Sequence, residues 1–360
     1  MLGHDRWLEE GGIVMSTTPK QPQVPGDIPP AAALIQILVG GLVSRATHVA
    51  AKLGIADLLQ DSPRTCDELA KATGTHTRSL YRLLRALASA GVFKEAADGR
   101  FELTPIGDCL RTNAPVSFRA LGLVWSEPLI WDSLSDLLYS VQTGQPAFDR
   151  LHGMGFFTYL EKRPEAAEIF NHAMTDLSRE MHRAAIKDYD FSRLNTIVDV
   201  GGGHGALLST ILNAHPHLQG ILFDVPHVVE SARAVITTAG PGSRCVLVGG
   251  DFFQKVPAGG DAYLLAHILH DWDDTHALTI LKNIHQATAK GGKVLILEQV
   301  IPKGNEPHLG KVADLLMLAT LGGVERTERE FEELLNGAGF VLSKVTASPS
   351  PICIVEGVRS

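Results

Sequence analysis

The stretch Asn195–Gly205, NTIVDVGGGHG, decides the fold of this chain. Its apolar residues, Ile197, Val198 and Val200, predict a buried strand. Glycines follow at once, and they allow positive φ and the close approach of a ligand to the main chain. Residues 206–214 then predict a helix whose free N–H groups point at the same place. The pattern indicates the start of a nucleotide-type βαβ unit, although it lacks the G-x-G-x-x-G spacing of dinucleotide sites.

A second signal follows that helix. The apolar run Gly220–Phe223 ends at Asp224, directly before Val225-Pro226. In doubly wound folds an acidic residue at the end of the second strand accepts hydrogen bonds from ribose hydroxyls. Asp224 could instead cap the turn before Pro226, but the glycine turn and the acid together favour the ribose role.

The rest of the C-terminal half alternates strands with helices, which predicts a mostly parallel sheet. Expected strands lie near 196–200, 220–223, 244–248, 262–269, 293–298, 340–346 and 351–358, and crossover helices begin near 206, 227, 275 and 328. A Ser-Pro-Ser-Pro link joins the last two strands, and it is too short for a crossover, so this pair should be antiparallel. The expected fold class is therefore α/β, a Rossmann-like doubly wound domain over residues 191–360.

Composition limits the possible functions. With 360 residues the chain is long enough for two domains, and its net charge of −8 argues against a nucleic-acid carrier. The four cysteines form no C-x-x-C pair, as expected for free thiols in the cytoplasm. The longest apolar stretch, Ala31–Val43, is shorter than the roughly 20 residues of a membrane span, and Met1–Gly12 lacks the apolar core of a signal peptide. We therefore expect a cytoplasmic protein without a membrane partner.

The N-terminal half should form three regions. Residues 1–30 are rich in proline and predict a disordered tail. Residues 31–110 predict helices broken at Gly40-Gly41 and Gly54, a capping box at Thr65–Glu68, a helix over 77–90 and a hairpin turning at Asp98-Gly99. This order is a winged-helix pattern. Residues 111–190 predict a helical linker with turn formers at 142–155 and a helix over 156–187 interrupted near Pro164.

The winged-helix unit allows two interpretations. Arg78, Arg82 and Arg85 could read DNA from its second helix, which would make the chain a transcriptional regulator. Alternatively, these arginines form a solvated face and the apolar surfaces hold two chains together as a homodimer. The net negative charge of the chain and the cofactor-type domain that follows favour the homodimer.

Chemistry-bearing residues gather where open α/β sheets bind ligands, at the carboxyl ends of the predicted strands. The third strand ends in Gly249-Gly250-Asp251-Phe252-Phe253, an acid beside aromatic rings, which suits an adenine. The fourth ends in His270-Asp271-Trp272 and the fifth in Glu298. We expect no metal, because no Asp, Asn and His cluster with ligand spacing is present.

His270 is the one side chain of that set whose ordinary pKa lies near neutrality, so it can serve as a general base. A lone histidine is more often structural, but the position of His270 at the ligand edge favours catalysis. Glu298 is expected to hydrogen-bond its second nitrogen and to fix the tautomer. His204, His267 and His285 gain no such support, although His267 could also lie near the ligand.

In combination, the motifs VDVGGGHG, FDVP, GDFF, HDWDD and GGVERTEREFEELLNGAGF make the chain similar to the S-adenosylmethionine-dependent O-methyltransferases. That family includes plant caffeic acid and flavonoid enzymes, acetylserotonin methyltransferase and bacterial antibiotic-tailoring enzymes. The resemblance covers roughly residues 31–358. It implies the cofactor S-adenosyl-L-methionine and a homodimer.

The resemblance also implies roles for residues that match the family motifs. Gly201, Gly202 and Gly203 would hold the methionine end of the cofactor and Asp224 its ribose, while Asp251 and Phe252, with Phe253 beside them, would contact the adenine. His270 would be the catalytic base, with Glu298 and Glu325 as its carboxylate neighbours. Ser178 would lie near the cofactor, and Met174 and Trp272 near the substrate.

The resulting hypothesis is methyl transfer to a hydroxyl, phenolic in the expected case, of a small aromatic secondary metabolite. One alternative keeps the cofactor and the fold but carries out hydroxylation or decarboxylation, since bacterial relatives have drifted in this way. The transcriptional regulator is the alternative from another class. The identity of the methyl acceptor does not follow from the sequence.

Overall fold

The computed structural model describes residues 28–187, 189–238 and 241–360. The tail expected over 1–30 therefore lies almost wholly outside the described residues. The chain divides into two compact units. We call residues 28–139 and 147–177 the N-terminal unit, and residues 140–146 and 178–360 the C-terminal unit.

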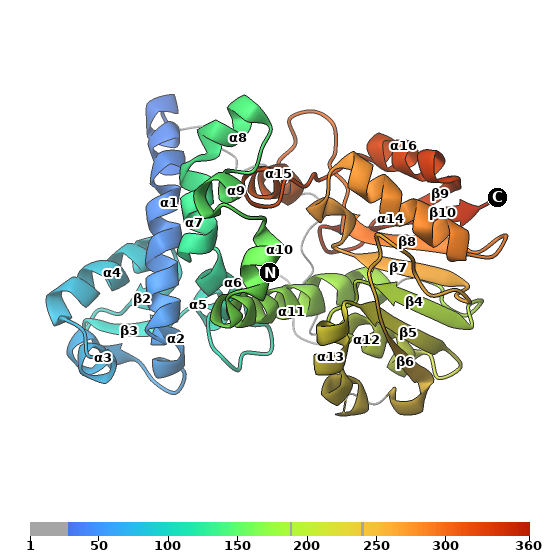
Figure 1. The fold of residues 1–360 in the computed structure, drawn as a ribbon. Helices are drawn as coiled ribbons and strands as arrows, with labels where there is room; N and C mark the ends of the chain where they lie inside the picture. Colours follow the sequence, from blue (N-terminus) through green and yellow to red (C-terminus); the bar gives the residue numbers. More distant parts are fainter. Residues whose placement is uncertain (1–27, 188, 239–240) are drawn as a thin grey trace, which may run out of the picture. The chain divides into compact units, whose positions relative to one another are not determined.

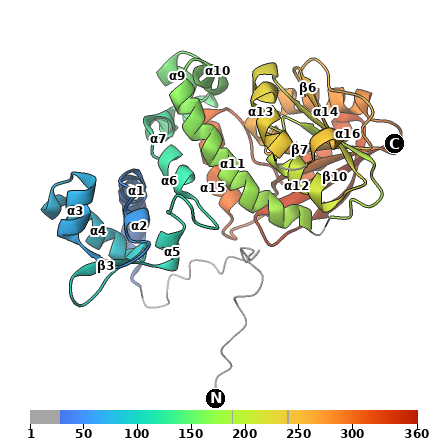
Figure 2. The ribbon, with the colours of Figure 1, turned by 90° about the horizontal axis from the view of Figure 1, so that it is seen from below.

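The N-terminal unit begins with the winged-helix arrangement that the sequence predicts (Figure 2). The Thr65–Glu68 capping box opens α3, and an antiparallel hairpin turns at Gly99, where φ is +77°. A third short strand pairs with the hairpin, and leucines of α4 fill the small core beneath it. The elements are α1 (Pro30–Lys52), α2 (Ile55–Leu58), β1 (Arg64–Thr65), α3 (Cys66–Thr73), α4 (Thr77–Ser89), β2 (Phe93–Glu95), β3 (Arg100–Leu103) and α5 (Pro105–Asp108).

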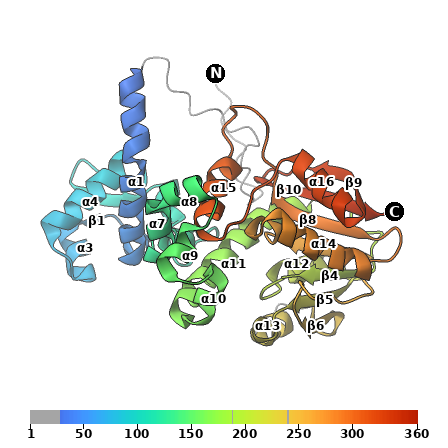
Figure 3. The same ribbon diagram turned by 45° about the horizontal axis from the view of Figure 1, so that its top comes forward.

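Helix α1 differs from the sequence prediction. It runs without interruption through Gly40-Gly41, because glycine weakens a helix by only about 1 kcal/mol. The break expected at Gly54 is present, with φ at +65°. Leucines and isoleucines on the first half of α1 are exposed, and this half extends past the other helices of its unit (Figure 3). At 23 residues α1 is, among the described residues, the one helix long and apolar enough by length and composition to cross a membrane, whereas the sequence predicted a shorter apolar stretch over Ala31–Val43.

The region between the two predicted domains is helical and consists of five short helices followed by the 24-residue α11. The residues rich in turn formers include one of them, α9, whose Phe148 side chain is buried against Phe156. Pro164 begins a new helix, where its fixed φ is compatible with the first turn. The elements are α6 (Arg119–Val124), α7 (Pro128–Ser135), α8 (Leu137–Thr143), α9 (Ala147–His152), α10 (Phe156–Glu161) and α11 (Pro164–Lys187).

The C-terminal unit contains the seven-stranded sheet, and each predicted strand is confirmed. The strand order is β6-β5-β4-β7-β8-β10-β9, with β4 to β8 parallel and β10 antiparallel to both its neighbours. The strands are β4 (Thr196–Val200), β5 (Gln219–Asp224), β6 (Cys245–Gly249), β7 (Ala262–Ala266), β8 (Lys293–Gln299), β9 (Phe340–Thr346) and β10 (Ile352–Arg359).

Helices cover both faces of the sheet (Figure 1). One face packs its valines and isoleucines against α14 and α16, and the other meets α12 and α13. Besides α11, the helices of this unit are α12 (Ala206–Ala214), α13 (Pro226–Thr238), α14 (Asp274–Ala287), α15 (Leu309–Thr320) and α16 (Glu328–Ala338), with 3-10 turns η1 (Gly242–Arg244) and η2 (Leu269–Asp271). Helix α15 is not among the helices that the sequence predicts. This doubly wound arrangement brings the carboxyl ends of β4 to β8 to one edge.

Candidate active site

The glycine turn after β4 requires glycine because of its backbone conformation at 201 and 203 and because of close neighbours at 201. Gly201 and Gly203 adopt φ of +71° and +57°, and a Cβ on Gly201 would lie 2.6 Å from Cδ1 of Ile268. The Gly201 N–H donates to the carbonyl oxygen of Phe223 at 2.8 Å, which ties the turn to the end of β5. No atom lies within 4 Å of the position that a Gly203 Cβ would take. The main chain of the turn is thus firmly held yet open to a ligand at Gly203.

Asp224 joins this turn to β5. Its Oδ2 accepts the Gly203 N–H at 2.8 Å, and its Oδ1 accepts the Val225 N–H at 2.7 Å. Burial raises the pKa of this carboxyl, while the two N–H bonds oppose that rise. Each oxygen retains a further lone pair, so the carboxylate can still accept hydrogen bonds from a ligand's hydroxyls.

Asp199 is a site residue that the sequence analysis missed. It lies within β4 with 1% of its surface exposed, and neither carboxylate oxygen has a partner among the described residues. Burial, together with the charge of Asp224, raises its pKa to about 7. A Cβ on Gly202 would lie 2.6 Å from the Asp199 Cγ and still closer to Cδ1 of Leu222, so both side chains exclude a larger residue at position 202. An unpaired buried carboxyl beneath an open turn fits a cationic ligand.

Aromatic rings follow β6. The Asp251 carboxylate accepts the Phe253 N–H at 2.8 Å, and Asn283 of α14 donates to the carbonyl oxygens of Phe252 and Phe253. The Phe253 ring meets that of Trp272 edge to face at 4.8 Å. Trp272 thus packs beside the expected adenine residues. Together, the open glycine turn, Asp224, Asp199 and these rings fit an adenosine cofactor that carries a positive charge.

His270 lies just beyond β7, on the 3-10 turn η2. Its Nδ1 lies 2.9 Å from Oε1 of Glu325, and its Nε2 lies 3.4 Å from Oδ1 of Asp271. Because Glu325 can accept only from an N–H, this bond places a hydrogen on Nδ1 and leaves Nε2 as the basic nitrogen when the ring is neutral. Glu325 comes from the loop between α15 and α16, and its side chain is almost fully buried.

Glu298 has a different role from the one expected. Its Oε1 accepts the backbone N–H groups of Ile268, Leu269 and His270 at 3.2, 2.6 and 3.1 Å, and no bond joins it to the imidazole. The prediction that Glu298 fixes the tautomer was therefore wrong, because β8 ends beneath the main chain of this turn rather than beside the ring. Glu325, which the sequence analysis placed near His270 only by family resemblance, makes that bond.

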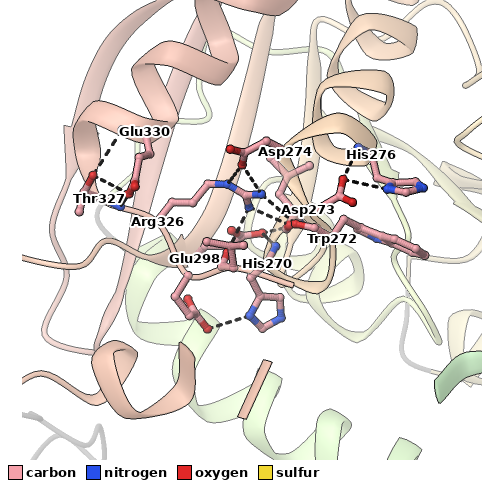
Figure 4. A network of polar contacts seen from close by, with 12 residues as sticks. His270, Trp272, Asp273, Asp274, His276, Glu298, Arg326, Thr327 and Glu330 are labelled. Atoms are coloured by element: carbon pink, nitrogen blue, oxygen red, sulfur yellow. Dashed lines mark hydrogen bonds and ion pairs between the residues drawn. The ribbon is translucent and has the colours of Figure 1, made fainter. Parts of the chain in front are cut away.

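Arg326 holds the same turn from its carbonyl side (Figure 4). Its guanidinium donates to the carbonyl oxygens of Leu269 and Trp272 at 2.9 and 2.8 Å and pairs with Asp274 at 2.9 Å. The side chain is fully buried. Arg326 directly follows Glu325, so one short segment fixes both the backbone and the ring of His270.

The charges around His270 favour its protonated form. Burial opposes protonation, but the carboxylates of Asp271, Glu325 and Glu298 outweigh burial and raise the pKa of His270 to about 10. For the acids, burial favours the protonated, neutral form, so it raises the pKa of Glu298 to about 7 and the pKa of Asp271 to about 6. These charges therefore favour an imidazolium among carboxylates at this site.

Two further expected residues, Met174 and Ser178, come from α11. Met174 belongs to the N-terminal unit, where it packs against Leu121, Val124 and Ala173. Ser178 lies on α11, and its side chain is outside the described residues. Among the residues that the structure describes, no three His, Cys, Asp or Glu side chains are grouped to hold a metal.

Two family models match the chain. The O-methyltransferase domain matches residues 131–341, and the O-methyltransferase dimerisation domain matches residues 35–113. A phenazine O-methyltransferase of Lysobacter antibioticus is 44% identical over 92% of this chain and 97% of its own length. An 8-amino-8-demethylriboflavin N,N-dimethyltransferase of Streptomyces davaonensis is 38% identical over 91% of this chain and 94% of its own length.

A solved O-methyltransferase from neocarzinostatin biosynthesis is also similar. It was crystallised with S-adenosyl-L-homocysteine and 1,4-dihydroxy-2-naphthoic acid. It superimposes with a TM-score of 0.76 at 33% identity, over 91% of this chain and 98% of its own. The similarity therefore spans both units of the chain.

The orphaned carboxyl of Asp199 leads to a binding prediction. Asp199→Asn should raise the Kd for S-adenosylmethionine about tenfold, because a charge-assisted contact is lost. The unliganded variant should be as stable as the wild type or more so, since it no longer buries an unpaired acid. Isothermal titration calorimetry and thermal melting measure the two effects. Asp190→Asn, which changes an exposed acid, should alter neither, and wild-type affinity in Asp199→Asn would contradict the prediction.

The raised pKa of His270 predicts a pH dependence of stability. A group whose pKa rises on folding contributes fully below its unfolded pKa of about 6.5 and loses that contribution as the pH rises to about 10. The wild type should therefore have a higher free energy of unfolding than His270→Gln at low pH, and this difference should decrease across the window. Urea unfolding at several pH values measures it. His217→Gln, at an exposed position, is the control, and parallel profiles for wild type and His270→Gln would refute the raised pKa.

Proposed function

Because the chain belongs to the family of S-adenosylmethionine-dependent O-methyltransferases, we propose that it methylates a hydroxyl of a small aromatic molecule, with His270 as the general base. The observation that carries this proposal is the bond between His270 Nδ1 and Glu325 at 2.9 Å. The turn that bears His270 also packs on the glycine turn, since Ile268 occupies the space beside Gly201. A base and a cofactor cradle are thus neighbours.

Each residue has a defined task in this proposal. The cofactor, when bound, supplies a methyl group that its sulfonium already activates. Asp224 would hold the ribose, Asp251 and the rings of Phe252 and Phe253 the adenine, and the Gly201–Gly203 turn with Asp199 the charged end. Nε2 of His270 takes the proton of the acceptor hydroxyl, and Glu325 stabilises the resulting imidazolium through Nδ1–H. Alignment of the two reactants should supply much of the rate.

The proton on His270 must leave before it can act as a base. A positive charge bound at the glycine turn disfavours a second positive charge nearby and so lowers the pKa of His270. Loading the cofactor site would therefore help to convert His270 from the imidazolium to the neutral base. Glu298 would act through the backbone of the turn and not on the proton.

An oxygen acceptor fits this site better than a nitrogen one. A phenol has a pKa near 10, as does the tyrosine side chain, so its proton must be removed as the methyl group arrives. A neutral amine already offers its lone pair and has less need of a base. The pairing of His270 with Glu325 therefore supports O-methylation, although a relative of this chain is an N,N-dimethyltransferase. Met174, Trp272 and Ser178 remain proposed contacts of the acceptor and cofactor.

We further propose that the N-terminal unit forms a homodimer and that the enzyme is cytoplasmic. The match to the dimerisation domain includes most of α1 and the whole winged-helix arrangement. The exposed apolar side chains of α1 offer a large surface for a second copy, which also accounts for the composition that α1 shares with a membrane helix.

Replacing the base tests the proposed function. His270→Ala should lower kcat by a factor on the order of 10² to 10⁴, because general base catalysis is lost. The affinity for S-adenosylhomocysteine should stay near that of the wild type. Labelled methyl transfer to a panel of phenols, with calorimetry, measures both. His217→Ala should retain full turnover, whereas full turnover in His270→Ala would remove this residue from the mechanism.

The dimer has its own test. Leu38 and Leu42 of α1 are 70% and 71% exposed in the single chain. The double variant Leu38→Asp, Leu42→Asp should shift the protein from dimer to monomer, because two charges cannot be buried in an apolar interface. Light scattering after size exclusion measures the mass. Val341→Asp, on the exposed side of the C-terminal unit, should remain dimeric, and an intact dimer in the double variant would rule out α1 as the interface.

A further inference from the structure

His267 is the one described non-glycine residue with positive φ, at +54°. It lies one residue beyond β7, and its N–H continues the ladder by donating to the carbonyl oxygen of Leu297 at 3.1 Å. The next three N–H groups all donate to Glu298. Left-handed backbone is unfavourable for a residue with a Cβ and persists only where the surroundings enforce it. The chain thus retains a strained histidine three residues before the proposed base.

The side chain of His267 is joined to a second buried histidine. Its Nδ1 lies 2.5 Å from Nε2 of His182, which comes from α11 within the same unit and is 2% exposed. The two rings are 4.6 Å apart, and the His267 ring is 5.0 Å from that of His270. Three imidazoles therefore follow one another from α11 to the catalytic turn, and the mechanism above uses only the last.

Burial keeps the first two rings neutral. It lowers the pKa of His182 to about 3 and the pKa of His267 well below its ordinary value, with the neighbouring histidines adding to both shifts. The bond between two neutral rings then needs one N–H and one lone pair.

The remaining nitrogen of His182 decides which ring donates. Its Nδ1 is buried without a partner among the described residues. A buried N–H without a partner is rarer in proteins than an unsatisfied acceptor, so this nitrogen carries the lone pair. The hydrogen of His182 is then on Nε2 and is donated to Nδ1 of His267. His267 must consequently carry its own hydrogen on Nε2, where it is a fixed donor.

We propose that His267 Nε2–H binds the methyl acceptor, at a hydrogen-bond acceptor atom next to the hydroxyl that His270 deprotonates. His182 is the positioning residue that fixes the tautomer. Unlike His182, His267 is partly exposed, and it lies beside His270 at the ligand edge of the sheet. The preferred substrates would be aromatics whose reacting hydroxyl is flanked by a ring nitrogen or carbonyl oxygen. This inference rests on the proposed function.

Isomeric substrates test this selectivity. In 1-hydroxyphenazine the hydroxyl is beside a ring nitrogen, and in 2-hydroxyphenazine it is remote from one. The wild type should favour the first in kcat/KM. His267→Ala should lower that preference about tenfold, mainly through KM, since one hydrogen bond to the substrate is lost. A wild type that favours the 2-isomer, or an unchanged preference in His267→Ala, would overturn the proposal.

Two further variants separate the side chain from the backbone. His267→Gly relieves the left-handed strain but has no donor, and His267→Asn tolerates this conformation and retains an N–H. The preference should be lost in the glycine variant and partly kept in the asparagine variant. Recovery in His267→Gly would instead assign His267 a purely conformational role. A weakened affinity for S-adenosylhomocysteine with the preference intact would assign the donor to the cofactor, and either result overturns the proposal.

The tautomers of His182 and His267 can be measured directly. Nitrogen-15 spectra of the histidine rings should show His267 with its hydrogen on Nε2 at neutral pH, and His182→Leu should remove that bias. His182→Leu and His267→Ala should each reduce the preference for the first isomer. Their effects should not add in the double variant, because the two residues act as one unit. A hydrogen on Nδ1 of His267, or additive effects, would contradict the proposal. Failure of the proposed function would give different results: neither isomer would be methylated, or His270→Ala would retain full turnover.

Discussion

The turn after β7 is clamped between a buried carboxylate and a buried guanidinium, and the proposed active site depends on this clamp. Glu298 binds three consecutive N–H groups of the turn, and Arg326 binds two of its carbonyl oxygens. A glycine at 323 is required as well, because a Cβ there would collide with the carbonyl group of His270. Neither side chain forms a hydrogen bond to the imidazole, yet together they fix the backbone of the turn that carries it. The direction of the proposed base is therefore set by buried ionic groups of the scaffold.

The balance of charge in this region also has a functional meaning. Three carboxylates, Asp271, Glu298 and Glu325, surround His270, and the second oxygens of Glu298 and Glu325 have no partner among the described residues. Asp199 adds another buried acid beneath the glycine turn. Burying so many acids without full pairing is costly. A cationic cofactor would offset part of that cost, so these buried acids favour a sulfonium ligand over a neutral one.

The sequence predicted the sheet well because alternating apolar runs and glycine turns are local signals. All seven strands appear, and their bounds and the starts of four crossover helices lie within about two residues of the expected positions, except that β7 ends three residues early, at Ala266. Contacts between residues far apart in the sequence were harder to predict. Glu298 and Glu325 could not be told apart as partners of the imidazole, since that choice depends on where β8 and the loop after α15 meet the turn.

Two other features were harder to predict from the sequence. Asp199 could have been noticed as an acid inside an otherwise apolar strand, which is costly unless it has a task. The pairing of His182 with His267 had no such mark, because 85 residues separate them and neither belongs to a motif. The uninterrupted α1 shows the reverse error, in which a local signal, Gly40-Gly41, was given too much weight.

A crystal structure of the protein with S-adenosylhomocysteine and a phenolic acceptor would test the central claim most directly. The account predicts Nε2 of His270 within hydrogen-bond reach, about 3 Å, of the acceptor oxygen, with that oxygen facing the cofactor sulfur above the glycine turn. An imidazole turned away from the sulfur, or an acceptor oxygen bound by another side chain, would contradict it.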